Sequence, residues 1–158
     1  MALERVDPEL SRSESGRAGR GTFPDWTVVA AIAGAGSLGA LARYGLAEAL
    51  PARSGGFPVA TLLTNLLGSL VIGVALAVLL ERFPDARFFR PVLVTGFLGG
   101  FTTFSTFAVD ADSLVRAHAV GTAVAYVLIS AVAGPLCAAL GLVSSRARFR
   151  IETAEEAA

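Results

Sequence analysis

Residues 95–107 read TGFLGGFTTFSTF, and this stretch decides the fold. It lies inside an apolar region, residues 88–115, that is long enough to cross a membrane. Its glycines and the four hydroxyl residues that follow them do not suit a regular helix that faces lipid. Gly99-Gly100 can interrupt the helix, which leaves carbonyl groups at the end of the first half and N–H groups at the start of the second. At membrane depth such a break is tolerated only inside protein or around an ion.

Three further apolar spans lie on either side of this region, at about residues 26–46, 57–80 and 118–143. The loops between the spans are short, so neighbouring helices should run antiparallel. The sequence therefore predicts an all-α membrane protein with four transmembrane helices, the third of them broken.

The composition agrees with this class of protein. The chain is 54% hydrophobic and 16% charged, and its mean hydropathy is +0.64. Charged residues cluster outside the spans, which divides the chain into three parts. We expect a disordered polar tail over residues 1–24, a transmembrane domain over 25–145 and a polar tail over 146–158.

Several functions are disfavoured by what the chain lacks. Its formal net charge is zero, so nothing indicates a nucleic-acid partner. A single cysteine, Cys137, and a single histidine, His118, cannot build a disulfide framework or a zinc or haem site. No plausible Ser/His/Asp set is present, and the chain is not predicted to be an enzyme. No acidic residue lies at the centre of a span, which disfavours a proton-coupled pump.

Two helices carry uncharged polar residues at intervals of four, so that each set shares one helix face. These residues are Thr61, Asn65 and Ser69 in the second span and Thr122, Tyr126, Ser130 and Gly134 in the fourth. The amide of Asn65 at membrane depth needs partners. It either bonds a neighbouring helix or lines a hydrated path, and the spacing leaves both readings open.

Beside the expected break, Phe104 and Phe107 share a helix face, with Thr103 one turn before Phe107. Aromatic ring edges are electropositive and can face an anion that has no compensating protein charge. Ordinary packing of two phenylalanines is the alternative.

Three segments together resemble the Fluc/CrcB family of fluoride channels. They are GAGSLGALARYG at 34–45, FPVATLLTNLLGSLVIG at 57–73 and TGFLGGFTTFSTF at 95–107. The resemblance implies a four-helix subunit that pairs as an antiparallel dimer, with two pores and a structural sodium ion at the dimer centre. Its expected activity is passive, fluoride-selective export of cytoplasmic fluoride across the cell (plasma) membrane, which protects against fluoride toxicity.

The resemblance also implies residue roles. Asn65 would be the pore amide, and Phe104 and Phe107 the aromatic pair. Main-chain oxygens of Gly99 and Thr102 would hold the sodium ion. The remaining roles are a polar track of Thr61, Tyr126 and Ser130, with Thr103 beside it, and a vestibule position for Arg43, which could equally reach out to the lipid headgroups.

Two features depart from the family pattern. Asp110 stands where the family usually has glutamate, so its part at the pore is uncertain. Ten of the thirteen arginines fall on the side that holds both termini, which predicts cytoplasmic termini and one preferred orientation. A homodimer of oppositely inserted copies, which is dual topology, and a heterodimer with a homologous four-helix subunit both stay open.

Two other functions compete with the channel. A small dual-topology exporter of the four-helix type is one, but the central membrane glutamate typical of that class is absent. A non-transporting membrane scaffold, in which the polar stripes only join helices, is the other.

Overall fold

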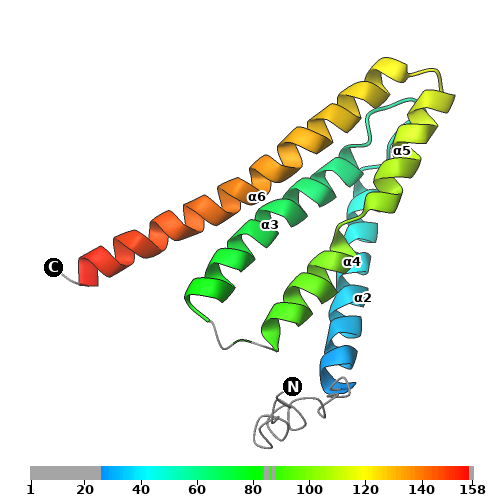
Figure 1. The fold of residues 1–158 in the computed structure, drawn as a ribbon. Helices are drawn as coiled ribbons and strands as arrows, with labels where there is room; N and C mark the ends of the chain where they lie inside the picture. Colours follow the sequence, from blue (N-terminus) through cyan, green and yellow to red (C-terminus); the bar gives the residue numbers. More distant parts are fainter. Residues whose placement is uncertain (1–25, 84–85, 87, 157–158) are drawn as a thin grey trace, which may run out of the picture.

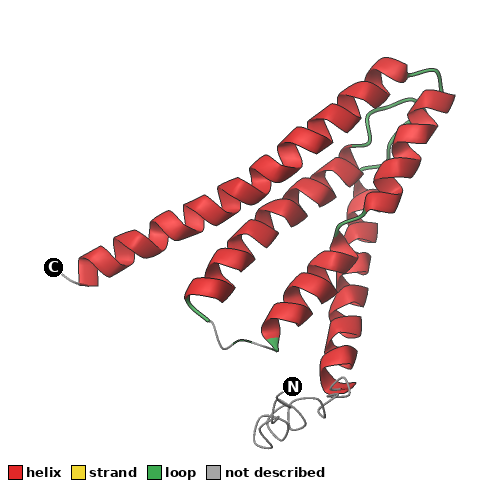
Figure 2. Ribbon diagram, in the orientation of Figure 1, coloured by secondary structure: helices red, strands yellow, loops and turns green. Residues whose placement is uncertain are grey.

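The computed structural model describes residues 26–83, 86 and 88–156, and within these ranges the chain forms helices and no strands (Figure 2). The polar tail expected over residues 1–24 lies outside the described residues. Four segments are long and apolar enough to cross a membrane: Trp26–Ala49, Val59–Glu81, Pro91–Arg116 and Val120–Ile151. The prediction of four transmembrane spans is confirmed.

The helices follow one another with short connections, so successive spans alternate in direction (Figure 1). The start of α2, the end of α3 and the end of α6 therefore lie at one end of the molecule. In chain order the elements are α2 (Trp26–Ala49), α3 (Val59–Glu81), the π-helix η1 (Pro91–Leu98), α4 (Gly99–Phe101), α5 (Phe104–Arg116) and α6 (Val120–Glu156).

The spans associate as two pairs. Helix α3 packs along α6, and α2 packs along η1 and α4, whereas α3 makes only slight contact with the third span. In Figure 1 the α3–α6 pair and the α2–η1–α4 pair diverge from each other towards one end. Helix α5 bridges them because it packs against α6.

Glycines allow the close approach of helices within each pair. A Cβ atom on Gly73 would collide with the carbonyl oxygen of Ala138, and one on Gly141 would collide with that of Leu70. In the other pair, a Cβ on Gly39 would collide with the carbonyl oxygen of Phe97. Lipid tails are as apolar as leucine, so close van der Waals packing of this kind is what holds membrane helices together.

Helical dihedral angles in the third span are interrupted at two threonines. Thr102 (φ −75°, ψ 156°) and Thr103 (φ −150°, ψ 124°) are both extended. Gly99 and Gly100, which were expected to interrupt the helix, are themselves helical. A Cβ on Gly100 would collide with the carbonyl oxygen of Gly36, so this glycine serves the packing of α4 against α2.

The ends of the last helix also differ from the expectation. His118 has a left-handed φ of 57° and forms the turn before α6, which begins at Val120. Pro135 lies inside α6 without ending it. The polar segment after residue 146 is helical as far as Glu156. Alanine, arginine and glutamate favour helix strongly, so the backbone continues beyond the apolar part of the span.

Candidate functional site

Asn65 joins α3 to the extended residues of the third span. Its Nδ2 donates to the Thr103 carbonyl oxygen (2.9 Å), and its Oδ1 accepts from the Thr103 N–H (2.9 Å). One amide side chain therefore satisfies both backbone groups of an extended residue at membrane depth. The structure shows Asn65 joining two spans through the backbone, and one amide hydrogen remains for another acceptor.

This arrangement removes the helical partners of carbonyl groups on the N-terminal side of the interruption. In a continuous α-helix the Thr103 N–H would donate to Gly99 and the Thr106 N–H would donate to Thr102. Instead the Thr103 N–H donates to Asn65, and the Thr106 N–H donates to Thr103 Oγ1 (3.1 Å), which caps α5. The carbonyl oxygens of Gly99 and Thr102 are thus among those at the interruption that have no intrahelical partner.

A groove of about 380 Å³ opens beside Asn65, between α3, α5 and α6. We call it the polar groove. Four of the residues that the resemblance placed at the pore line it together, namely Asn65, Phe104, Phe107 and Ser130. The other lining residues are Leu62, Leu66, Ser69, Val127, Ala131 and Gly134, so no charged side chain lines the polar groove.

The aromatic pair forms part of the lining of the polar groove. The rings of Phe104 and Phe107 have centroids 5.7 Å apart and an interplanar angle of 39°. Phe104 is 80% exposed within the subunit, whereas Phe107 is half-buried against Tyr126, with ring centroids 5.1 Å apart. Phe104 therefore presents its ring outside the subunit rather than packing in its core.

Ser130 contributes a polar atom that the fold leaves unsatisfied. Its Oγ is buried and has no hydrogen-bond partner among the described residues. An unpaired buried hydroxyl costs about 1–3 kcal/mol, so such groups in native proteins call for an explanation. Ser130 is one of the residues that line the polar groove.

Tyr126, which was expected on the same track, occupies a different place. It is fully buried, packs edge-on against Phe57 (5.6 Å between centroids), and is not among the residues that line the polar groove. Its hydroxyl donates weakly to Asp110 Oδ2 (3.5 Å) and also has Thr61 as a partner. Asp110 thus supports Tyr126 beneath Phe107, a contact that the sequence analysis did not foresee.

A second, smaller groove of about 200 Å³ contains Arg43, Thr61, Thr103 and Thr106. Arg43 Nε donates to the Gly100 carbonyl oxygen (3.3 Å), and its Nη1 lies 3.5 Å from Thr106 Oγ1. Arg43 therefore contacts both sides of the interruption in the third span. Sequence reasoning missed this contact, because nothing in the pattern links residues 57 positions apart.

Metal ligands of the usual side-chain types are not grouped in the described part of the chain, where no set of three or more His, Cys, Asp or Glu residues could hold an ion. A cation beside the interruption would depend on main-chain oxygens instead.

Comparisons with known proteins point to one family. The family model described as "CrcB-like protein, Camphor Resistance (CrcB)" matches residues 30–142. A Streptomyces avermitilis protein named fluoride-specific ion channel FluC 2 is 50% identical over 99 residues, which are 63% of each chain. A Streptomyces coelicolor protein named fluoride-specific ion channel FluC 1 is 45% identical over 106 residues, 67% of this chain and 69% of that one.

A Francisella protein gives a similar match. The fluoride-specific ion channel FluC of Francisella tularensis subsp. mediasiatica is 40% identical over 110 residues, 67% of this chain and 85% of that one. Coverage of the relatives varies. The chain spans 63% of the length of the first Streptomyces avermitilis relative and 58% of a second, named FluC 3.

Proposed function

Since the chain belongs to the CrcB family, we propose that it is one subunit of a passive, fluoride-selective channel that releases cytoplasmic fluoride and protects the cell from fluoride toxicity. The observation that carries the proposal is the polar groove, in which an amide, an unpaired buried hydroxyl and two aromatic rings line one uncharged space. The proposal involves no covalent chemistry.

The lining suits a small anion that holds its water tightly. Fluoride leaves water only where donors replace its hydration shell, and a channel must also release the ion again. The remaining N–H of Asn65, the Ser130 hydroxyl and the ring edges of Phe104 and Phe107 are weak, uncharged contacts. A full positive charge in the polar groove would bind the ion too tightly for passage.

We further propose that the working unit is an antiparallel dimer. Phe104 supports this, because its ring is 80% exposed in the single subunit and a second subunit packed on it would add van der Waals contacts there. The divergence of the α3–α6 and α2–η1–α4 pairs also supports it, because one subunit leaves faces of both pairs without a partner.

A structural sodium ion fits the chemistry of the interruption. Hard cations prefer oxygen ligands, and the main-chain oxygens of Gly99 and Thr102 have lost their helical partners. These oxygens would hold the ion, which would supply positive charge at a helix end that is otherwise negative. The proposal places this ion at the centre of the dimer.

The identity of the second subunit depends on orientation. The chain is a multi-pass membrane protein, and its arginine distribution supports cytoplasmic termini in the plasma membrane. A chain that inserts one way needs a differently oriented homologue for an antiparallel dimer. Streptomyces avermitilis has two proteins with distinct numbers, FluC 2 and FluC 3, which supports a heterodimer over a homodimer of this chain.

Flux from proteoliposomes tests the channel. Vesicles loaded with potassium fluoride and containing the purified chain should release fluoride when a potassium ionophore is added, as read by a fluoride electrode, whereas chloride-loaded vesicles should release almost none. The chain should be tested alone and together with a co-expressed homologue. If no dimer releases fluoride, the channel proposal is refuted and the non-transporting scaffold is favoured. If chloride is released as fast as fluoride, the proposed selectivity for fluoride is refuted.

A further inference from the structure

A second polar feature lies far from the interruption, at the end of the bundle where α3 stops and α6 continues. A groove of about 710 Å³ opens there. We call it the terminal groove. Its lining residues are Glu81, Val143, Arg146, Ala147, Arg150 and Ile151.

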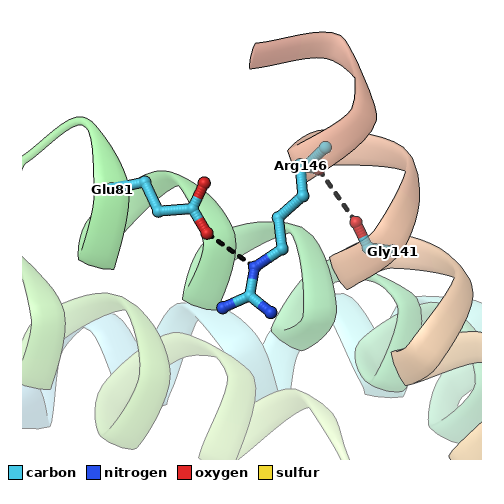
Figure 3. A network of polar contacts seen from close by, with 4 residues as sticks. Glu81, Gly141 and Arg146 are labelled. Atoms are coloured by element: carbon cyan, nitrogen blue, oxygen red, sulfur yellow. Dashed lines mark hydrogen bonds and ion pairs between the residues drawn. The ribbon is translucent and has the colours of Figure 1, made fainter. Parts of the chain in front are cut away.

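Two contacts hold the polar end of α6, residues 146–156, which we call the α6 extension, against the end of α3. Arg146 Nε donates to Glu81 Oε1 (2.5 Å) (Figure 3), and the Arg82 guanidinium lies 5.0 Å from the centroid of the Phe149 ring. The α6 extension is therefore a defined wall of the terminal groove.

The ion pair leaves part of Arg146 available. Its side chain is 50% exposed, and only Nε is engaged by Glu81. Figure 3 shows the two terminal nitrogens pointing away from the carboxylate, and they have no partner among the described side chains. Those two N–H₂ groups can still donate in the forked geometry that suits a phosphate.

The depth of the terminal groove can be worked out from helix length. Helix α3 has 23 residues, which at 1.5 Å per residue is roughly 35 Å, close to the thickness of the hydrocarbon core. Glu81 ends this helix, so its bond to Arg146 lies near the boundary between acyl chains and headgroups. Arg150 follows Arg146 by one helical turn, on the same face and farther towards water.

We propose that the terminal groove binds the headgroup of an anionic phospholipid. Arg146 and Arg150 donate to the phosphate, while Val143, one turn deeper, contacts the first acyl carbons. Two arginines against one glutamate leave a net positive charge in the lining, which favours an anionic headgroup over a zwitterionic one. The inference depends on the chain being embedded in a membrane, not on fluoride conduction.

A lipid held there would stabilise the contact between the α6 extension and α3. Thermal unfolding of the detergent-solubilised full chain should therefore respond to added lipid. Short-chain phosphatidylglycerol should raise the Tm, whereas the same concentration of phosphatidylcholine or inorganic phosphate should change it little. A rise with phosphate alone would overturn the proposal, because the site would then be one for the free anion.

Variants assign the response to the terminal groove. Arg150→Gln leaves the Glu81–Arg146 ion pair intact. The double variant Arg146→Gln/Arg150→Gln should lose most of the Tm increase that phosphatidylglycerol causes. Arg116→Gln is the matched control. Arg116 is also exposed (78%) and ion-paired, in its case to Asp112, but it lies at the end of the third span, at the opposite end of the helix bundle from the terminal groove. It should respond like the wild type.

The lipid-binding proposal can be tested even if the double variant does not fold. If the double variant is aggregated, Arg150→Gln alone should still show a smaller shift and fewer phosphatidylglycerol molecules bound in native mass spectrometry. Equal shifts for the wild type and Arg150→Gln would overturn the proposal, as would equal responses to phosphatidylcholine and phosphatidylglycerol. Fluoride flux, measured separately, tests the channel and is not a readout of this site.

Discussion

Replacing Asn65 with alanine removes both hydrogen bonds that hold Thr103 in its extended conformation. Each backbone group left without a partner costs about 1–3 kcal/mol, or about 2–6 kcal/mol for the two. Hydrogen bonds measured between membrane helices are weaker, at about 0.6 kcal/mol on average. The higher range applies here, because an extended Thr103 has no helical ladder to supply substitute partners.

A loss of this size is measurable in two independent ways. At about 2–4 °C per kcal/mol for a chain of this length, Asn65→Ala should lower the Tm by at least about 4 °C. Fluoride flux should fall at least about tenfold, since each 1.4 kcal/mol that disfavours the conducting arrangement changes its population tenfold.

A neighbouring threonine provides the control. Thr64 is 1% exposed, and its hydroxyl donates only to Ala60 of its own helix (2.8 Å). Thr64→Val removes a buried hydroxyl that bonds only its own helix and leaves both Asn65–Thr103 hydrogen bonds in place, so its Tm should stay close to that of the wild type. If Asn65→Ala unfolds at the wild-type temperature and still forms dimers, the backbone role assigned to Asn65 is refuted, whatever happens to the flux.

Three further predictions concern other parts of the subunit. Phe104→Ile should slow fluoride flux up to about tenfold with little loss of stability, because the ring is exposed in the subunit and an aromatic contact contributes about 0.5–1.5 kcal/mol beyond its area. Unchanged flux would exclude a role in the path. Ser130→Ala should raise the free energy of unfolding by about 1 kcal/mol, since it removes an unpaired buried hydroxyl, yet lower fluoride flux. A destabilised variant would show that the hydroxyl has a partner. Gly141→Ala should lower stability by about 1–3 kcal/mol, because its Cβ would collide with the Leu70 carbonyl, and an unchanged Tm would contradict the close packing of α3 on α6.

Much of the fold and part of the site could be read from the sequence. Hydropathy identifies the four spans because it reports directly on the solvent each helix needs. A spacing of four placed Asn65 on one face of α3 and Ser130 on one face of α6, and both line the polar groove. Helical periodicity is local, so it is visible in one sequence.

What could not be read depends on contacts between distant residues. Nothing in the pattern shows that Asn65 bonds Thr103, 38 positions away. Consequently the interruption was placed at Gly99-Gly100, where glycine flexibility suggested it, although those residues are needed for packing. The helical extension of α6 to Glu156 was missed for another reason, since the hydropathy of a segment reports its solvent and not its backbone conformation.

The geometry of Asn65 has a consequence for turnover. An amide offers two donor hydrogens, and the Thr103 carbonyl occupies one of them. A passing halide would therefore find a single hydrogen at this position, too few to detain it. Because Asn65 offers the ion only one donor, the ion would bind weakly there and leave quickly. A pore that conducts rapidly needs such short-lived binding.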